Sequence, residues 1–165
     1  GGAGRVVTYA AVAAVVVLGG LTYVDRVRWA RKVVSSDVTN AYLLRPGERD
    51  ALAYLDRTPG PGGVFADLRI GLTVPMRTDR RVWLGALSWT PDWWSRVALA
   101  RRLAGGGLDA RQTREVVLAS GARFVVTDCV VSSDLTRKLA PILEGVRRFD
   151  CASVYTIRRR PEPGR

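Results

Sequence analysis

The clearest strand in the sequence is RFVVT, at residues 123–127. Before it, Asp109 and Gln112 form a capping-box pattern that predicts a helix start, and Gly121 predicts the end of that helix. After it, Ser133 is predicted to cap a further helix, which Pro141 interrupts or kinks. A strand with a helix on each side predicts an α/β fold.

Strands and helices continue to alternate on both sides of this segment. In order, the remaining expected elements are a helix at 46–55, a strand at 64–67, an irregular stretch at 68–81, a strand at 82–87, a helix from 90 to about 104, and a strand at 152–157. Thr90 is expected to cap its helix, with Pro91 at the first position. The pattern predicts a small, Rossmann-like sheet, parallel or mixed, with helices packed on it.

An apolar segment, Val6–Val24, runs for 19 residues without a charge. As a helix it would span about 28 Å, close to the hydrocarbon thickness of a bilayer. Tyr9 and Tyr23 lie near its ends, where interfacial aromatics are found. A signal peptide, a buried core helix and a buried strand pair are alternatives, but the segment has no cleavage site and no turn signal. We expect a transmembrane helix.

The expected organisation has four parts. Residues 1–32 form a transmembrane anchor with a basic cluster, 33–45 a connector, 46–158 the α/β domain and 159–165 a polar tail. Because Gly1 is not an initiator methionine, we interpret the chain as a piece of a longer protein.

The charge is strongly basic, with 26 Lys and Arg against 15 Asp and Glu and a net charge of +11. The arginines are spread along the chain, and no nucleic-acid-binding signature accompanies them, so nucleic acid is not an expected partner. The one dense cluster, at residues 26–32, follows the apolar segment. Such a cluster typically contacts anionic lipid headgroups, which makes the lipid bilayer the expected partner.

The residue inventory argues against several kinds of active site. The chain has no histidine, its two cysteines do not have zinc-site spacing, and no glycine-rich phosphate loop follows a strand. We therefore expect no catalytic residue, metal site or cofactor within this chain.

Candidate contacts with substrate or membrane come from arginines and tryptophans. Four of the five tryptophans fall within residues 83–94. Neighbouring helical positions diverge by about 100°, so Trp93 and Trp94 cannot both face one core, and we expect one indole to be half exposed or at an interface. The alternative is that the tryptophans serve only to pack the core. Arg77, Arg80 and Arg81 could bind a phosphate, although in an arginine-rich chain this signal is weak. The candidates are Arg77, Arg80, Trp89, Asp92, Trp93 and Trp94.

Two further pairs of residues lie next to predicted strands. Asp67 and Asp128 follow strands, where α/β sheets place ligand contacts, but capping of the following turn is the favoured interpretation. Cys129 and Cys151 flank a presumed βαβ crossover, which predicts parallel strands and two free thiols at opposite ends. An antiparallel pairing would instead bring the two cysteines together.

The order of several motifs resembles a known family. They are Ala53–Leu55 leading to Thr58-Pro59, Val64–Ala66, Gly71 with Pro75, Thr78–Gly85, Thr90–Asp92 and Leu118–Val126. This series is similar to the C-terminal segment of bacterial polytopic glycosyltransferases of the GT-C type, which use polyprenyl-phosphate-linked sugars. Asp79 and Ala86 depart from the pattern, because glycine and histidine are frequent at those places.

The resemblance implies a last transmembrane helix and an extracytoplasmic α/β domain in the cell envelope. It assigns the catalytic acid to an early loop outside this chain. The implied partners are the remaining transmembrane part of the same protein and a lipid-linked sugar or glycan acceptor. The basic cluster alone would place the domain in the cytoplasm. The alternative function is a single-span, membrane-anchored binding or interaction module without catalytic activity.

Overall fold

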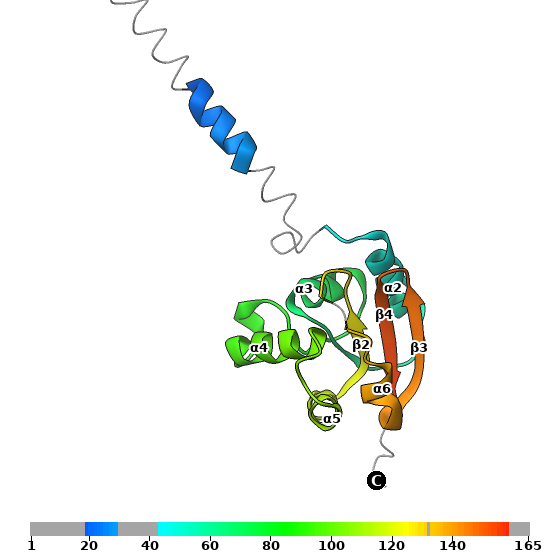
Figure 1. Cartoon of the computed structure of the whole chain (residues 1–165). Coiled ribbons are helices and arrows are strands. Elements are labelled where there is room, and N and C mark those ends of the chain that lie inside the picture. The colour runs from blue at the N-terminus through cyan, green and yellow to red at the C-terminus, as the bar shows by residue number, and fades with distance from the viewer. Residues whose placement is uncertain (1–18, 30–42, 132, 159–165) are drawn as a thin grey trace, which may run out of the picture. The chain divides into compact units, whose positions relative to one another are not determined.

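The computed structural model describes residues 19–29, 43–131 and 133–158 (Figure 1). The chain divides into two units, residues 1–40 and 41–165. In the first unit, residues 19–29 are helical. No helix in the described ranges is both long and apolar enough to cross a membrane. Residues 6–18, which make up most of the predicted span, lie outside the described residues. The same holds for residues 33–42 of the connector and for the whole polar tail.

The second unit is a mixed α/β domain, as the sequence predicts. Its four strands are β1 (Gly63–Phe65), β2 (Ala122–Thr127), β3 (Leu143–Phe149) and β4 (Ala152–Ile157). They form one sheet in the order β1-β2-β4-β3. Only β1 and β2 are parallel, whereas β4 is antiparallel to both β2 and β3. The sheet is therefore mixed, with one parallel crossover followed by a hairpin.

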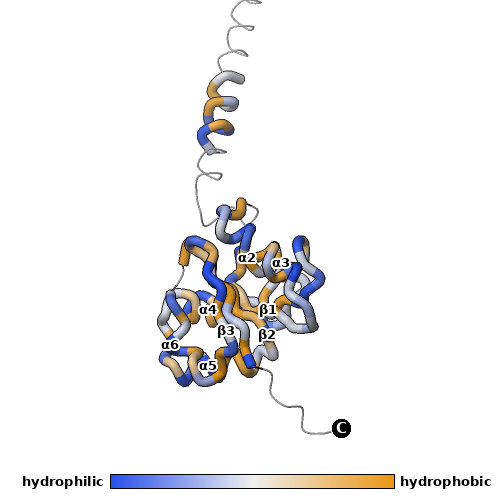
Figure 2. The backbone as a smooth tube through the Cα atoms, turned by 90° about the vertical axis from the view of Figure 1, so that its right-hand side faces the viewer, coloured by the Kyte–Doolittle hydropathy of each residue, from blue (hydrophilic) through white to orange (hydrophobic). Residues whose placement is uncertain are grey.

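Helices cover both faces of this sheet. They are α2 (Pro46–Arg57), α3 (Leu68–Arg77), α4 (Trp93–Ala104), α5 (Ala110–Ala119) and α6 (Thr136–Leu139), with 3₁₀ turns η1 (Leu87–Trp89) and η2 (Ala140–Ile142). Helices α2 and α3 pack with Phe124 and Val154 on one face. Helices α4, α5 and α6 pack with Val125 and Tyr155 on the other. Apolar residues of β1 and β2 lie at the centre of the domain (Figure 2).

Several local predictions are confirmed. Helix α2 begins at Pro46, and β4 has the expected bounds. The Asp109 side chain accepts a hydrogen bond from the Gln112 N–H, and the Gln112 side chain accepts one from the Asp109 N–H. Gly121, just after α5, has a φ of 66°, the left-handed conformation that glycine adopts most easily at a helix end.

The expected irregular stretch at 68–81 is wrong, because α3 occupies most of it. The Asp67 side chain caps this helix by accepting a hydrogen bond from the Ile70 N–H. Gly71 allows the helix to lie directly against the chain at Leu84. A Cβ atom at Gly71 would lie 2.0 Å from the Leu84 carbonyl oxygen, so the glycine serves close packing here and does not break the helix.

The expected strand at 82–87 is also wrong, since within it only Val82 pairs, in an isolated bridge with Val64. Thr90 does not cap α4. Its hydroxyl oxygen accepts a hydrogen bond from the Gly85 N–H, and the helix begins after Asp92, whose φ is 51°. The segment between Val82 and Trp93 is thus a folded loop with one 3₁₀ turn.

The second half of the sheet departs from the expected βαβ crossover. Ser133 donates its hydroxyl to the Ala104 carbonyl oxygen and caps no helix. Helix α6 is short, and β3 follows it and forms a hairpin with β4. Because β4 runs antiparallel to β2, Cys129 and Cys151 lie opposite each other and form a disulfide with Cα atoms 4.8 Å apart. The prediction of two free thiols is therefore wrong.

Candidate functional site

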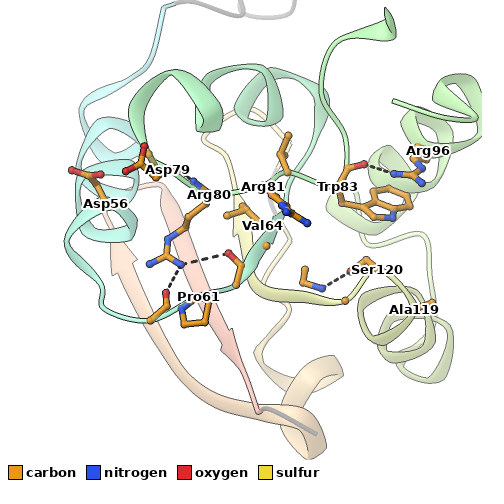
Figure 3. A pocket seen from close by; sticks show the side chains of 17 residues that line it. Asp56, Pro61, Val64, Asp79, Arg80, Arg81, Trp83, Arg96, Ala119 and Ser120 are labelled. Carbon is orange, nitrogen blue, oxygen red and sulfur yellow. Dashed lines mark hydrogen bonds between the residues drawn. The ribbon is translucent and has the colours of Figure 1, made fainter. Parts of the chain in front are cut away.

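An open groove of about 850 Å³ lies at the N-terminal ends of β1 and β2 (Figure 3). Three segments form it: the turn 60–64 that leads into β1, residues 78–83 that follow α3, and residues 119–122 between α5 and β2. Arg96 from α4 and Asp56 from α2 complete the lining. Its volume lies in the range of small-molecule sites, roughly 300–1,000 Å³.

Arg80 holds one wall of the groove in place. Its Nε donates to the Leu55 carbonyl oxygen at 3.0 Å, and Nη1 donates to that of Gly60 at 3.0 Å. Nη2 donates to the Thr58 carbonyl oxygen, and the guanidinium carbon lies 4.6 Å from the Phe124 ring centroid. These contacts occupy Arg80 with the turn after α2, so its main role here is to position the backbone.

Arg81 and Arg96 retain free donors in the same groove. The Arg81 side chain is exposed, and within the described part of the chain no hydrogen bond or ion pair engages its guanidinium. Arg96 donates from Nη1 to the Trp83 carbonyl oxygen at 2.6 Å, and its guanidinium carbon lies 4.9 Å from the Trp83 ring centroid. Trp83 also stacks on Phe65, with ring centroids 4.6 Å apart. Arg96 is thereby held with further N–H groups available.

An exposed aromatic segment, Leu87–Trp94, joins the groove to α4. The Leu87, Trp89 and Trp94 side chains are 60%, 79% and 76% exposed. Trp93 instead packs against the core, and its Nε1 donates to the Gly85 carbonyl oxygen at 3.0 Å. The prediction that one indole of the Trp93–Trp94 pair packs while the other is exposed is confirmed.

The six predicted site residues do not form one site. Only Arg80 lines the groove. Arg77 is exposed in the last turn of α3, and Asp92 is exposed at the start of α4. Trp89, Trp93 and Trp94 belong to the aromatic segment. Arg81, one of three arginines considered as phosphate ligands but not among the six candidates, also lines the groove. Arg96 was not predicted, because its contact with Trp83, 13 residues away, leaves no local pattern in the sequence.

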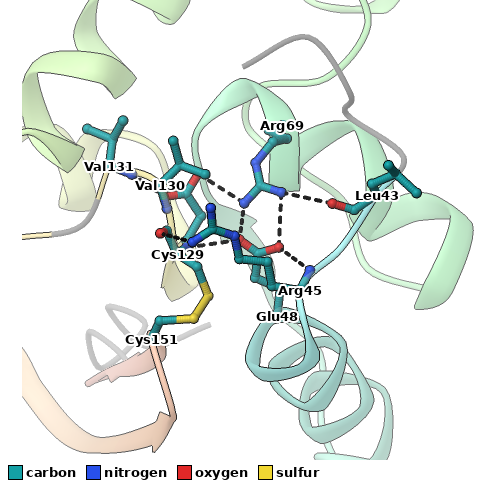
Figure 4. Close-up of a disulfide and its surroundings, with 9 residues drawn as sticks. Leu43, Arg45, Glu48, Arg69, Cys129, Val130, Val131 and Cys151 are labelled. Carbon is teal, nitrogen blue, oxygen red and sulfur yellow. Dashed lines mark hydrogen bonds and ion pairs between the residues drawn. A yellow bond between two sulfur atoms is a disulfide. The ribbon is translucent and has the colours of Figure 1, made fainter. Parts of the chain in front are cut away.

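A second polar cluster lies at the opposite, C-terminal ends of β1 and β2, beside the disulfide (Figure 4). The Arg69 guanidinium donates to both carboxylate oxygens of Glu48, to Asp128 Oδ2 at 3.4 Å and to the Leu43 carbonyl oxygen at 3.3 Å. Glu48 also accepts a hydrogen bond from the Cys129 N–H at 2.9 Å. Arg69 Nε is buried and has no hydrogen-bond partner among the described residues. The cluster joins α2, α3 and the segment after β2.

Asp67 and Asp128 belong to this end of the sheet and influence each other. Burial, and then the charge of Asp128, raise the pKa of Asp67 to about 7. Burial acts to raise the pKa of Asp128 as well, but the N–H groups of Val131 and Val130 and the Arg69 charge lower it overall. Each carboxylate caps the turn that follows its strand, which confirms the capping interpretation. Among the described residues, no group of His, Cys, Asp or Glu could hold a metal ion.

No family model and no curated protein matches this chain. The function proposed below therefore rests on the sequence resemblance together with the arrangement of the groove and the aromatic segment.

Proposed function

We propose that this chain is the C-terminal accessory segment of a membrane glycosyltransferase. In this proposal the enzyme transfers a sugar from a lipid-phosphate donor, its catalytic residues lie outside this chain, and the α/β domain covers the active site or helps to hold the acceptor. The observation that carries the proposal is the convergence of the motifs behind the GT-C resemblance. The turn after Thr58-Pro59, the start of β1 and the Thr78–Trp83 segment are separate in the sequence but line one groove.

The aromatic segment supports a role at a ligand or membrane surface. The loop is held by the Gly85–Thr90 hydrogen bond and by the Trp93 indole, yet it leaves Trp89 and Trp94 in solvent. Large exposed apolar side chains that gather on an ordered segment typically mark interaction sites. Indoles suit both a bilayer interface and the face of a sugar ring, since they combine an apolar ring with a polar N–H.

The disulfide supports an extracytoplasmic position for the domain. Cys129 and Cys151 are joined, and such bonds persist in oxidising compartments and are rare in the cytosol. The Val6–Val24 segment supports attachment to the membrane through a transmembrane helix, by its length and its lack of charge. The basic residues that follow it remain compatible with this topology if earlier helices determine the orientation.

The topology is tested by labelling in intact cells. Ala98, which is exposed on α4, is replaced by cysteine. The two native cysteines form a disulfide and do not react, so the label reports on the introduced thiol. A membrane-impermeant maleimide should label Ala98→Cys without permeabilisation if the domain is extracytoplasmic. Labelling only after permeabilisation would contradict the proposal.

The enzymatic part is tested on the gene that encodes this chain. The proposal requires a long upstream region with some eight or more further apolar spans and an acidic residue after the first. It also requires that Trp94→Ala lowers sugar transfer by the full-length enzyme. A gene with a single span would instead favour the membrane-anchored interaction module.

A further inference from the structure

We infer that the groove at the N-terminal ends of β1 and β2 binds a sugar phosphate. The inference deepens the proposed function and rests on it for the class of ligand. The groove combines a basic end, at Arg81 and Arg96, with an acidic end, at Asp56 and Asp79 (Figure 3). A sugar phosphate has the two matching parts, an anionic group and a ring of hydroxyls.

The basic end has the chemistry of a phosphate site. A guanidinium presents five N–H donors in a planar fork that matches phosphate oxygens. Arg81 is exposed with no partner among the described residues, and Arg96 is oriented by the Trp83 carbonyl oxygen and by the Trp83 ring. Both guanidiniums line the groove, and the proposal is that they contact one phosphate together.

The acidic end has the chemistry of a hydroxyl site. Asp56 and Asp79 are both exposed, and neither side chain has a hydrogen bond or an ion pair within the described ranges. Ionised carboxylates are acceptors only, so they suit sugar hydroxyls, which donate. Arg80 also lies at this end, but its guanidinium already donates to backbone carbonyl oxygens, so the two carboxylates are the groups available to hydroxyls (Figure 3).

The groove between these ends is preformed. The Arg80 guanidinium holds the turn after α2 in place, because it donates hydrogen bonds to the carbonyl oxygens of Leu55 and Gly60. The Gly62 position is closely packed, because a Cβ there would lie 2.3 Å from the Arg123 Cβ. A rigid wall reduces the entropy that binding must overcome, so a small polar ligand can bind measurably.

Binding is measured by titration calorimetry on the full chain in a zwitterionic detergent at low salt. The probes are glucose 1-phosphate, a short-chain isoprenyl phosphosugar, inorganic phosphate and methyl glucoside. We expect saturable binding of at least one phosphosugar with a Kd on the order of 1 mM or below. Tighter binding of the isoprenyl compound assigns the ligand to a lipid-linked source, and tighter binding of the monoester assigns it to a soluble one. Inorganic phosphate and methyl glucoside should each bind at least about tenfold more weakly than the better phosphosugar.

Variants distinguish the groove from general attraction by a basic protein. Arg81→Gln should weaken phosphosugar binding by about tenfold or more, as expected for the loss of charged hydrogen bonds. Arg77→Gln, an exposed arginine outside the groove, is the matched control and should leave binding unchanged. Asp79→Asn should weaken phosphosugar binding and leave inorganic phosphate at least as strongly bound.

The inference is wrong if no probe binds saturably, if inorganic phosphate binds as well as the phosphosugars, or if Arg77→Gln weakens binding as much as Arg81→Gln. Its failure is separate from that of the proposed function. If no probe binds but Trp94→Ala still reduces transfer, only this inference is overturned. If the phosphosugars bind but the gene encodes a single-span protein, only the glycosyltransferase proposal is overturned.

Discussion

Arg69 and Glu48 form an ion pair whose side chains are only 8% and 0% exposed. The pair joins the start of α2 to α3, and the Glu48 carboxylate also accepts the Cys129 N–H. A buried carboxylate is tolerated only while its charge is compensated by a partner and by hydrogen bonds. This pair therefore stabilises the contact between the two helices on one face of the sheet.

Removal of one member of this pair should strongly destabilise the domain. We expect Arg69→Ala to lower the free energy of unfolding by about 3–5 kcal/mol, because Glu48 is left charged and buried. Urea denaturation of the full chain measures the change. The exposed pair Arg111–Glu115 provides the control, and Arg111→Ala should leave the unfolding midpoint nearly unchanged. Equal effects of the two variants would contradict a structural role for Arg69.

Loss of the disulfide should lower stability through the unfolded state. Cys129 and Cys151 are separated by 22 residues, and closing a loop of this length corresponds to about 3 kcal/mol in the chain-entropy model. We expect this cost for the variant with both cysteines changed to serine, measured by urea denaturation. Dithiothreitol should destabilise the wild type and leave the double variant unaffected. Two titratable thiols in the denatured, unreduced wild type would show that the bond does not form.

The raised pKa of Asp67 predicts a pH dependence of stability. Because the folded-state pKa is about 7 and the ordinary value is 3.8, the fold favours the protonated carboxyl. Its stabilising contribution is fully present below pH 3.8 and is lost as the pH rises through about 7. Asp67→Asn, which resembles the protonated group, should therefore gain stability relative to wild type between pH 4 and pH 8.

Chemical denaturation at several pH values measures this difference. Asp128 contributes the opposite trend, since its lowered pKa gives stability that is lost as the pH falls, so only the gap between variant and wild type is informative. Asp109→Asn is the control for changing a helix-capping carboxylate. A gap for Asp67→Asn that stays constant from pH 4 to pH 8 would contradict the shift.

Trp93 and Trp94 should respond differently to truncation. Trp93 packs against the core and donates to Gly85, so Trp93→Ala should cost about 3 kcal/mol of stability. Trp94 is 76% exposed, so Trp94→Ala should change stability by less than about 0.5 kcal/mol while lowering transfer by the full-length enzyme. Urea denaturation and a transfer assay test the pair. If both variants simply unfold, the segment serves packing alone.

Local signals in the sequence predicted part of this fold well. The capping residues of α5, the strand at 122–127 and the last strand carry their information within a few neighbouring positions. Helix α3 was missed because Gly71 and Pro75 resemble helix breakers. Glycine is needed at position 71 because the helix packs there directly against Leu84. Leu84 is 13 positions away in the sequence, so no local pattern reveals this contact.

Strand β3 was missed for a different reason. Its partly buried apolar side chains, Leu143, Val146 and Phe149, are three residues apart, and the pairing is irregular between Leu143 and Gly145. That spacing is typical of a helix, whereas a strand with one buried face shows a period of two. The missing hairpin led to the wrong strand direction and hence to the wrong state of the cysteines. The groove was equally hard to predict, because Arg81, Arg96 and Asp56 meet only in three dimensions.

The Cys129–Cys151 bond closes a covalent ring that contains β3, the strand at the free edge of the sheet. A single proteolytic nick inside the ring leaves the two fragments joined by the disulfide, so Cys129 after β2 and Cys151 before β4 stay side by side. An unprotected edge strand can otherwise leave its sheet and pair with another molecule. The ring restrains such an exchange, and it leaves the groove at the other end of the sheet unobstructed.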